Sequence, residues 1–412
     1  MTPLALACAL AGAVLVIATL ASHRSLARTL GAPTGPVPER ASWPSLTIVR
    51  PIKGLDVGAR ANLEALFAAS YPGELEILLV LDDTRDAAFT LARDQVELHK
   101  ARGHRAELLL AGAPPSGRTG KLHAMLVGFA RAQGELVAFN DSDTRPTPEL
   151  WRRLVDALAT HPRGGAAFAP VVAVPEREMS AGDFGYALLL NGWYGPAAVR
   201  AGGVRGELPF IMGQAMIFTR PAIDAIGGLT CADGHFVDDM WLGTSIARAG
   251  LANLQIDAPL AVVIGGMKVG TFLRTFRRWL LFSEGGLPPT FLHPQWLRGG
   301  LYGLTLLATI VPLAGGALLG VVMPLVALGA FGWSEVALHR ARGGTKAPLG
   351  HLWVALVLPL AGALVALSTL LVREVDWRGR TYALDGKAHL ASPAARPPGG
   401  RSPRRRTARP LP

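Results

Sequence analysis

Two carboxylates one residue apart, Asp141 and Asp143, follow a short apolar run near the middle of the chain. The run covers residues 135–140 and has the composition of a strand. In an extended segment the side chains at positions i and i+2 point to the same side. Both carboxylates are therefore expected to face one crevice, where they suit Mg²⁺ or Mn²⁺, whose other ligands are water and phosphate oxygens. The alternative is a polar loop that caps a helix over residues 146–160.

Two further acidic pairs occur in the chain. Asp82 and Asp83 follow a second strand-like run, residues 76–81. Asp238 and Asp239 lie at the start of an apolar helix that ends near residue 249. Acidic residues also stabilise the start of a helix through its dipole, so the third pair alone is open to a purely structural interpretation.

A short helix-like segment, residues 272–282, concentrates basic and aromatic side chains: Arg274, Arg277, Arg278 and Trp279. Guanidinium groups bind phosphate well, although a basic surface helix beside a membrane has the same composition. A phosphate loop is not indicated around Lys121, because Pro115 and Leu122 stand where that motif needs Gly and Ser or Thr. No glycine-rich dinucleotide motif follows the first expected strand.

Strand-like and helix-like runs alternate through the first part of the chain. The expected strands cover residues 46–49, 76–81, 106–110 and 136–140, and the expected helices cover residues 59–70, 84–102 and 121–132. This alternation predicts an α/β fold with a mostly parallel sheet and helices on both faces. Ligands of such sheets bind beyond the carboxyl ends of the strands, where two of the acidic pairs fall. Gly213 interrupts the apolar run 210–218, which often marks a close approach of the backbone.

Half of the 412 residues are hydrophobic, and they concentrate outside this region. Residues 1–22 are expected to form an amino-terminal transmembrane anchor, followed by a linker over residues 23–44. Arg24 and Arg28 follow the apolar run, which favours an uncleaved anchor over a signal peptide. The positive-inside rule then places residues 45–284, the expected catalytic domain, in the cytoplasm of a multi-pass protein of the cell membrane.

The carboxyl-terminal part is expected to return to the membrane after an interfacial connection over residues 285–300. Residues 301–333 would be about 50 Å long as one helix, longer than a bilayer core, so Gly315 and Gly316 predict a helical hairpin. Residues 351–372 either cross the membrane or, because of Pro359, form a re-entrant segment. Residues 373–412 are expected to be a basic, largely disordered tail.

The net charge of +11 raises the question of nucleic acid as a partner. A nucleic-acid binder needs its basic residues on a face of the folded domain. Here much of the excess lies in the tail beside membrane segments, at Arg396, Arg401, Arg404, Arg405, Arg406 and Arg409. The charge is therefore assigned to the lipid bilayer, and no nucleic-acid partner is expected.

Together these motifs resemble the GT-A glycosyltransferases of family 2, and within them the membrane-bound, ceramide glucosyltransferase-like group of family 21. The resemblance covers residues 43–385. It is carried by Arg50 to Asp56, Asn62-Leu63, Tyr71-Pro72, Asp82-Asp83, Gly120-Lys121, Asp141 to Asp143, Gly227-Gly228, Val237 to Asp239, Arg278-Trp279 and the tail motif Trp377 to Tyr382. It implies a GT-A domain that transfers a hexose from a UDP-sugar donor to the hydroxyl of a membrane lipid, with inversion.

The resemblance also implies roles for individual residues. Asp82 or Asp83 would contact the uridine, and Asp141 and Asp143 would place Mg²⁺ or Mn²⁺ on the diphosphate. Asp239 would be the general base. The remaining roles are donor binding for Lys53, Lys121 and Arg278 and acceptor binding for Asp238 and Trp279.

The chain departs from the family pattern at one position. The signature has Gln or Arg four residues before the Trp, and here that residue is Thr275. Either the local helix is shifted in register, or Arg274 or Arg277 substitutes. Residues 112–120 lack the sequence of hopanoid-linked relatives, which weakens a hopanoid acceptor. A polyprenyl-lipid acceptor stays an alternative. A polysaccharide synthase would need more spanning helices. A catalytically silent scaffold would not need all the carboxylates.

Overall fold

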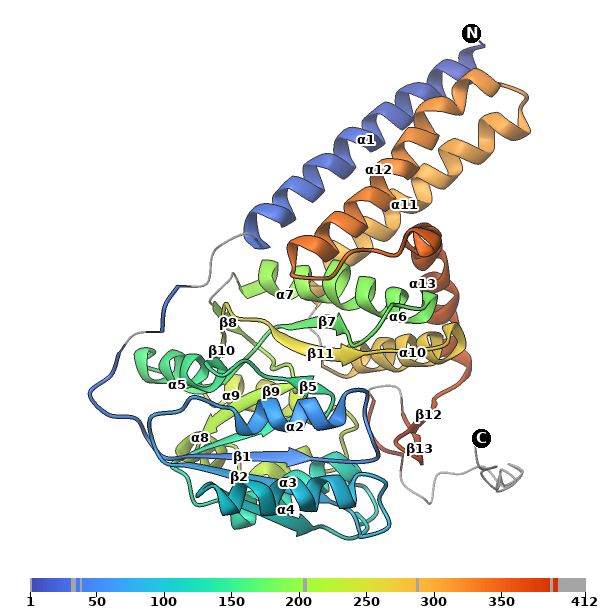
Figure 1. Cartoon of the computed structure of the whole chain (residues 1–412). Coiled ribbons are helices and arrows are strands. Elements are labelled where there is room, and N and C mark those ends of the chain that lie inside the picture. Colours follow the sequence, from blue (N-terminus) through green and yellow to red (C-terminus); the bar gives the residue numbers. More distant parts are fainter. Residues whose placement is uncertain are drawn as a thin grey trace.

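A computed structural model of the chain describes residues 2–30, 35–37, 39–202, 206–286, 289–385 and 388–391. An α/β domain occupies most of the molecule, and three long helices project from one side of it (Figure 1). The segment with the tail arginines, from residue 392 onward, lies outside the described residues.

The central sheet has eight strands in the order β3-β2-β1-β4-β9-β6-β10-β8. Their bounds are β1 Leu46–Pro51, β2 Leu75–Leu81, β3 Arg105–Leu110, β4 Leu136–Asn140, β6 Gly164–Phe168, β8 Gly206–Leu208, β9 Ala215–Thr219 and β10 Ala252–Gln255. Strands β1 to β4 are mutually parallel, whereas β9 runs antiparallel to both β4 and β6. The predicted α/β fold with a mostly parallel sheet is therefore confirmed.

Successive residues of the central strands enter two different hydrophobic cores. In β1, Ile48 belongs to the core on one face and Val49 to the core on the other; in β4 the same holds for Ala138 and Phe139. Both faces are thus apolar, as expected for a buried parallel sheet. The covering helices are α2 Ala59–Phe67, α3 Phe89–Ala101, α4 Gly120–Arg131 and α5 Leu150–Thr160. The carboxyl ends of β1, β2 and β4 remain open at one edge.

A second layer of elements lies beside this edge. A three-stranded sheet joins β5 Thr144–Arg145, β11 Leu260–Ile264 and β7 Val171–Pro175. The helices here are α6 Ala181–Leu188, a π-helical turn Leu189–Tyr194, α7 Gly195–Gly202, α8 Arg220–Ala225, α9 Asp238–Arg248 and α10 Val269–Gly286. Helices α9 and α10 present their residues to the carboxyl ends of the parallel strands.

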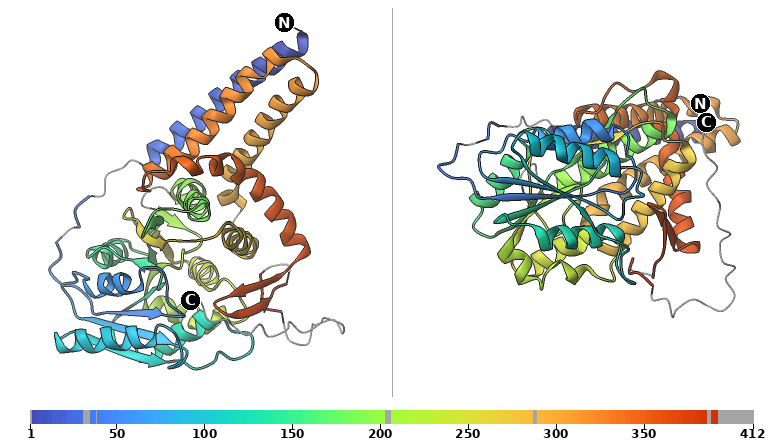
Figure 2. Two further views of the ribbon diagram at one scale, coloured as in Figure 1. Left: turned by 45° about the vertical axis from the view of Figure 1, so that its right-hand side comes forward. Right: turned by 60° about the horizontal axis from the view of Figure 1, so that its bottom comes forward.

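The three projecting helices are α1 Pro3–Leu30, α11 Pro289–Ala314 and α12 Val322–Ala341, which pack along one another (Figure 1). Helix α13, Trp353–Leu371, instead runs along the α/β domain, where it contacts α10 and α6 (Figure 2). By length and composition, three helical segments of the described chain suffice to cross a membrane: Pro3–Arg28, Leu318–Ala341 and Leu349–Leu371.

Three boundaries differ from those expected from the sequence. Helix α1 continues to Leu30, into the expected linker, because residues 23–30 contain neither Gly nor Pro. Helix α11 begins at Pro289, so most of the expected interfacial connection is helical. The expected disordered tail begins with a β-hairpin of β12 Glu374–Trp377 and β13 Arg380–Ala383, because Val375 and Leu384 are buried against Phe236 and Leu281.

Candidate active site

A pocket of about 510 Å³ opens at the carboxyl ends of β1, β2 and β4. Six carboxylates line it: Asp56, Asp82, Asp141, Asp143, Asp238 and Asp239. Five cationic side chains also line it: Lys53, Lys121, Arg278, Arg378 and Arg380. The fold therefore brings all three acidic pairs of the sequence to one cavity, although one member, Asp83, lies outside it.

A buried arginine fixes the end of strand β4. Arg50 is fully buried, and its guanidinium donates to the Asn140 side chain and, over 2.9 Å, to the Asn62 carbonyl. Burial lowers the pKa of Arg50 to about 10, but the carboxylates of Asp141 and Asp143 stabilise its charge. The Asp141 amide in turn donates to the Gln214 carbonyl over 2.9 Å. Hydrogen bonds from Arg50 to Asn140 and from the Asp141 amide to Gln214 thus fix the backbone that leads into the carboxylate pair.

The two side chains of this pair have different partners. Lys121 Nζ lies 2.6 Å from Oδ1 of Asp141, whereas Oδ1 of Asp143 is buried and has no hydrogen-bond partner among the described residues. Burial and the nearby Asp141 charge raise the pKa of Asp143 to about 6. No cluster of three or more His, Cys, Asp or Glu side chains able to hold a metal occurs in the described part of the chain. Two carboxylates, one with an unpartnered oxygen, fit a cation that takes its other ligands from phosphate and water.

Asp239 is held at the first turn of α9. Its Oδ2 accepts a hydrogen bond of 2.6 Å from the Gly213 amide, and its Oδ1 accepts one of 2.9 Å from the Met240 amide. Burial and the adjacent Asp238 raise the pKa of Asp239 to about 7, while the Lys121 charge opposes the shift. Such a carboxylate exchanges a proton near neutral pH, as a general base must.

The neighbouring Asp238 side chain is more deeply buried than that of Asp239, and one of its carboxylate oxygens lacks a hydrogen bond. Its side chain is 4% exposed, and Oδ2 has no hydrogen-bond partner in the described chain. Burial raises the pKa of this carboxyl as well. An unpaired buried oxygen that faces a pocket is suited to accept a hydrogen bond from a ligand hydroxyl.

An aromatic wall faces the carboxylates. Trp279 of α10 packs edge-to-face against Tyr186 and Tyr194, with ring centroids 6.3 and 5.0 Å apart, and all three side chains line the pocket. The adjacent Arg278 guanidinium lies over the rings of Phe282 and Trp377. Burial lowers the pKa of Arg278, and its Nε has no hydrogen-bond partner among the described residues. This cation is thus available to an anionic ligand.

Comparison of the sequence with known protein families gives a match. The sequence profile described as glycosyl transferase family 21 matches residues 4–390, nearly the whole chain. The chain belongs to glycosyl transferase family 21. The GT-A type of α/β fold expected from the sequence agrees with this assignment.

Individual relatives of this glycosyltransferase are distant. Ceramide glucosyltransferase 3 of Caenorhabditis elegans is 20% identical over 363 residues, covering 87% of this chain and 76% of the relative. Ceramide glucosyltransferase 1 of the same organism is 22% identical over 247 residues, covering 60% and 51%. A mannosyltransferase from Pyrobaculum calidifontis, solved in complex with GDP-Man and Mn²⁺, is a similar structure with 19% identity and a TM-score of 0.47, covering 87% of this chain and 99% of that one.

One acidic residue of the expected site lies elsewhere in this family 21 glycosyltransferase. Asp83 is outside the pocket, where its carboxylate accepts hydrogen bonds from the backbone and guanidinium of Arg85. Of the two acids after β2, Asp82 faces the pocket and pairs with Lys53 over 2.9 Å. The alternation of side chains at the strand end separates the two.

The expected substitution for the first signature residue is not found. Arg274 donates to the Thr271 hydroxyl, and Arg277 donates to the Glu374 carbonyl, so neither guanidinium serves the pocket. Thr275 itself lines the cavity. Three pocket residues were not predicted as such from the sequence: Asp56, Arg378 and Arg380. The motif from Trp377 to Tyr382 was a signal for the two arginines.

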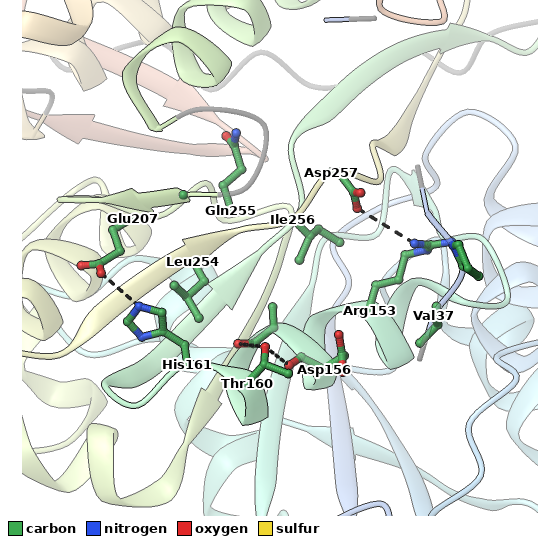
Figure 3. A pocket seen from close by; sticks show the side chains of 13 residues that line it. Val37, Arg153, Asp156, Thr160, His161, Glu207, Leu254, Gln255, Ile256 and Asp257 are labelled. Atoms are coloured by element: carbon green, nitrogen blue, oxygen red, sulfur yellow. Dashed lines mark hydrogen bonds and ion pairs between the residues drawn. The ribbon is translucent and has the colours of Figure 1, made fainter. Parts of the chain in front are cut away.

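A second pocket, of about 420 Å³, lies beside α5 and β10 (Figure 3). Two ion pairs join side chains that line it: His161 with Glu207 over 3.1 Å, and Arg153 with Asp257 over 4.0 Å. None of the predicted site residues lines it.

Proposed function

We propose that this glycosyltransferase is a metal-dependent, inverting enzyme that transfers a hexose from a UDP-sugar to a hydroxyl of a ceramide-like membrane lipid. The observation that carries the proposal is the single pocket that joins Asp141 and Asp143 to Asp239 and to the aromatic wall at Trp279. Two chemically different subsites, one for a metal diphosphate and one for an apolar acceptor, thus share one cavity. The ceramide glucosyltransferases among the relatives support a lipid acceptor.

The donor half of the site is assigned to the edge of β1, β2 and β4. Asp82, with Lys53, would contact the nucleoside, and Asp141 and Asp143 would hold Mg²⁺ or Mn²⁺. When bound, such an ion offsets the negative charge that develops on the departing UDP. Lys121 and Arg278 would bind the diphosphate oxygens. Lys121 pairs with Asp141 over 2.6 Å and is therefore already placed beside the metal-binding carboxylate.

The acceptor half contains the proposed base. Asp239 takes the proton of the lipid hydroxyl while the hydroxyl oxygen forms a bond to the anomeric carbon. The bond from that carbon to the diphosphate oxygen breaks, and UDP leaves with the electron pair. One displacement of this kind inverts the anomeric configuration. Asp238 would accept a hydrogen bond from the acceptor, and Trp279 would pack against it.

We also propose that α1, α11 and α12 cross the bilayer together, which the positions of their ends support. The turn between α11 and α12 lies beside the start of α1, since a Cβ at Gly315 would contact Leu4 and one at Gly320 would contact Ala5. At the opposite end of the bundle, Arg342 donates to the Val171 carbonyl of the α/β domain over 2.9 Å. With α1, α11 and α12 across the bilayer, Arg24, Arg28, Arg340 and Arg342 lie on the catalytic side, which the positive-inside rule makes cytoplasmic.

The proposal is tested by incubating membranes that contain the protein with a panel of UDP-sugars and lipid acceptors, followed by mass spectrometry of the lipids. Transfer of one hexose to a lipid, abolished in an Asp239→Asn variant, is the expected result. A polymeric product would favour a polysaccharide synthase. Hexose transfer that survives in Asp239→Asn would contradict the assignment of the base.

A further inference from the structure

The β-hairpin β12–β13 forms one wall of the active-site pocket, although it follows the last apolar helix in the chain. Trp377, Arg378, Arg380 and Tyr382 all line the pocket. Figure 1 shows the hairpin beside the α/β domain, at the end of the connection from α13. The carboxyl-terminal segment is therefore part of the site.

The hairpin packs against α10 and against the residues just before α9, the two helices that carry Arg278 and Asp239. Val375 packs in a small core with Phe236, just before α9, and with Leu281 of α10. The Arg277 guanidinium donates to the Glu374 carbonyl over 2.6 Å. These contacts fix the hairpin turn relative to Asp239 and Arg278.

The turn itself contains an unusual residue. Its two loop residues, Arg378 and Gly379, both have positive φ, 50° and 77°. Two-residue hairpin loops of this kind favour Asn-Gly, because most side chains are strained in the left-handed region. An arginine here is costly for the turn, so its side chain is expected to have another use.

The contacts of Arg378 lead toward the metal-binding carboxylates. Its Nη1 lies 2.6 Å from Oδ1 of Asp56 and donates to the Lys53 carbonyl over 3.0 Å. The other oxygen of Asp56 accepts a 2.5 Å hydrogen bond from Ser142, the residue between Asp141 and Asp143. The Arg378 side chain is 35% exposed, so it remains accessible to a ligand at the pocket mouth.

Charge explains why the site needs this residue. Without the hairpin, the six pocket carboxylates face only the cations of Lys53, Lys121 and Arg278. Each further cation in such a pocket favours the binding of a diphosphate. Arg380 forms an ion pair with Asp82, with 2.7 Å between Nη2 and Oδ2. Thr275 contributes no charge where the family signature has Gln or Arg.

We propose that Arg378, on the carboxyl-terminal hairpin, binds the diphosphate of the nucleotide donor. The inference rests on the proposed function, because it assumes a nucleotide-diphosphate donor. On donor binding, the guanidinium exchanges Asp56 for phosphate oxygens while the hairpin stays in place. Arg378 is thus a donor-binding residue contributed from beyond the membrane helices.

An Arg378→Asn variant tests this, because Asn suits the positive φ of the turn. Its thermal unfolding temperature, compared with that of the wild type, shows whether the protein remains folded. Binding of UDP in the presence of MnCl₂ should weaken about 10-fold or more, the effect of one lost charge-assisted hydrogen bond. Binding of uridine, which lacks the diphosphate, should change by less than about 2-fold, within the scatter of a surface substitution. Arg378→Lys should give an intermediate loss, and Arg274→Asn is the matched control with no loss.

Each other outcome is informative. Unchanged UDP affinity in Arg378→Asn, with wild-type protein that binds UDP, would overturn this inference alone. Tighter UDP binding would overturn it too, since the arginine would then compete with the donor. Equal losses for uridine and UDP would assign Arg378 to the nucleoside and reject the diphosphate contact. A wild-type protein that binds no UDP would contradict the proposed function as well.

Discussion

The Gly213 amide donates a 2.6 Å hydrogen bond to Oδ2 of Asp239, and a Cβ at residue 213 would lie only 2.5 Å from the same oxygen. It would also lie 2.7 Å from the Cβ of Asp239, which cannot rotate away. The loop after β8 and the start of α9 therefore approach as closely as glycine allows. The position of the proposed base depends on this contact.

Gly213→Ala is therefore expected to lower kcat about 100-fold, the typical effect of displacing a reacting group by an ångström. The Michaelis constant for the donor should rise by a smaller factor than kcat falls. Lys53 and Asp82 follow β1 and β2, and Lys121, whose Nζ donates to the Gly213 carbonyl over 3.3 Å, links the loop to the donor half of the site. Steady-state kinetics with membranes would measure both. The matched control is Gly329→Ala in α12, where a Cβ meets nothing within 4 Å. Equal activity of the two variants would show that the base is not positioned by this contact.

The pH dependence of turnover provides a second prediction. A base works only when ionised, and the pKa of Asp239 is raised to about 7. Below that value, kcat should fall about tenfold per pH unit, and above it kcat should level off. The charges that face Asp239 are those of Asp238, Lys121 and Asp141.

Two variants should move this midpoint in opposite directions. Asp238 raises the pKa of Asp239, so Asp238→Asn should shift the midpoint to lower pH. Lys121 lowers that pKa, so Lys121→Met should shift the midpoint to higher pH. Shifts of the same sign in the two variants would exclude Asp239 as the titrating group.

Sequence patterns predicted which acidic residues follow the strands of the sheet, but they did not predict the β12–β13 hairpin. Alternating runs place Asp82 and Asp141 at the same sheet edge, because parallel strands end together. Gly213 was expected to mark a close approach, and the structure names Asp239 as the partner. These inferences succeed because they depend on local periodicity and strand direction.

The hairpin was missed for a different physical reason. Trp377 and Tyr382 are apolar anchors only because Phe236 and Leu281 lie opposite them, and those residues are distant in sequence. By composition alone, the hairpin segment resembles the arginine-rich residues that follow it, so both were assigned to one disordered tail. The choice between Asp82 and Asp83 likewise depends on strand register, which a pair of adjacent acids does not reveal.

Removal of divalent metal is expected to stop hexose transfer, because Asp141 and Asp143 would then face an uncompensated diphosphate. EDTA should abolish activity, and MnCl₂ or MgCl₂ should restore it. In Asp143→Asn, the dependence of UDP binding on MnCl₂ should be lost, as measured by titration calorimetry. Asp83→Asn serves as the control, since Asp83 pairs with Arg85 outside the pocket. A normal metal titration in Asp143→Asn would refute the proposed metal site.

Helix α13 is long and apolar enough to cross a membrane, yet it packs against α6 and α10 of the α/β domain. Its buried residues, such as Leu358 and Gly362, face that domain, whereas Leu364 and Leu371 are 69% and 85% exposed on the other side. Beyond it, Arg380 reaches Asp82. We therefore expect α13 to lie in the membrane interface, with the hairpin on the catalytic side.

Labelling with a membrane-impermeant maleimide tests this topology in a background that carries Cys8→Ser and Cys231→Ser. Asp376→Cys, at an exposed position of β12, should react only from the side of the catalytic domain. Leu318→Cys, in the turn between α11 and α12, should react only from the opposite side, since that side chain is 68% exposed beside the start of α1. Comparing sealed and inverted vesicles separates the two. If α13 crosses the bilayer, both positions will react from the same side, and Arg378 will have no route to the donor site.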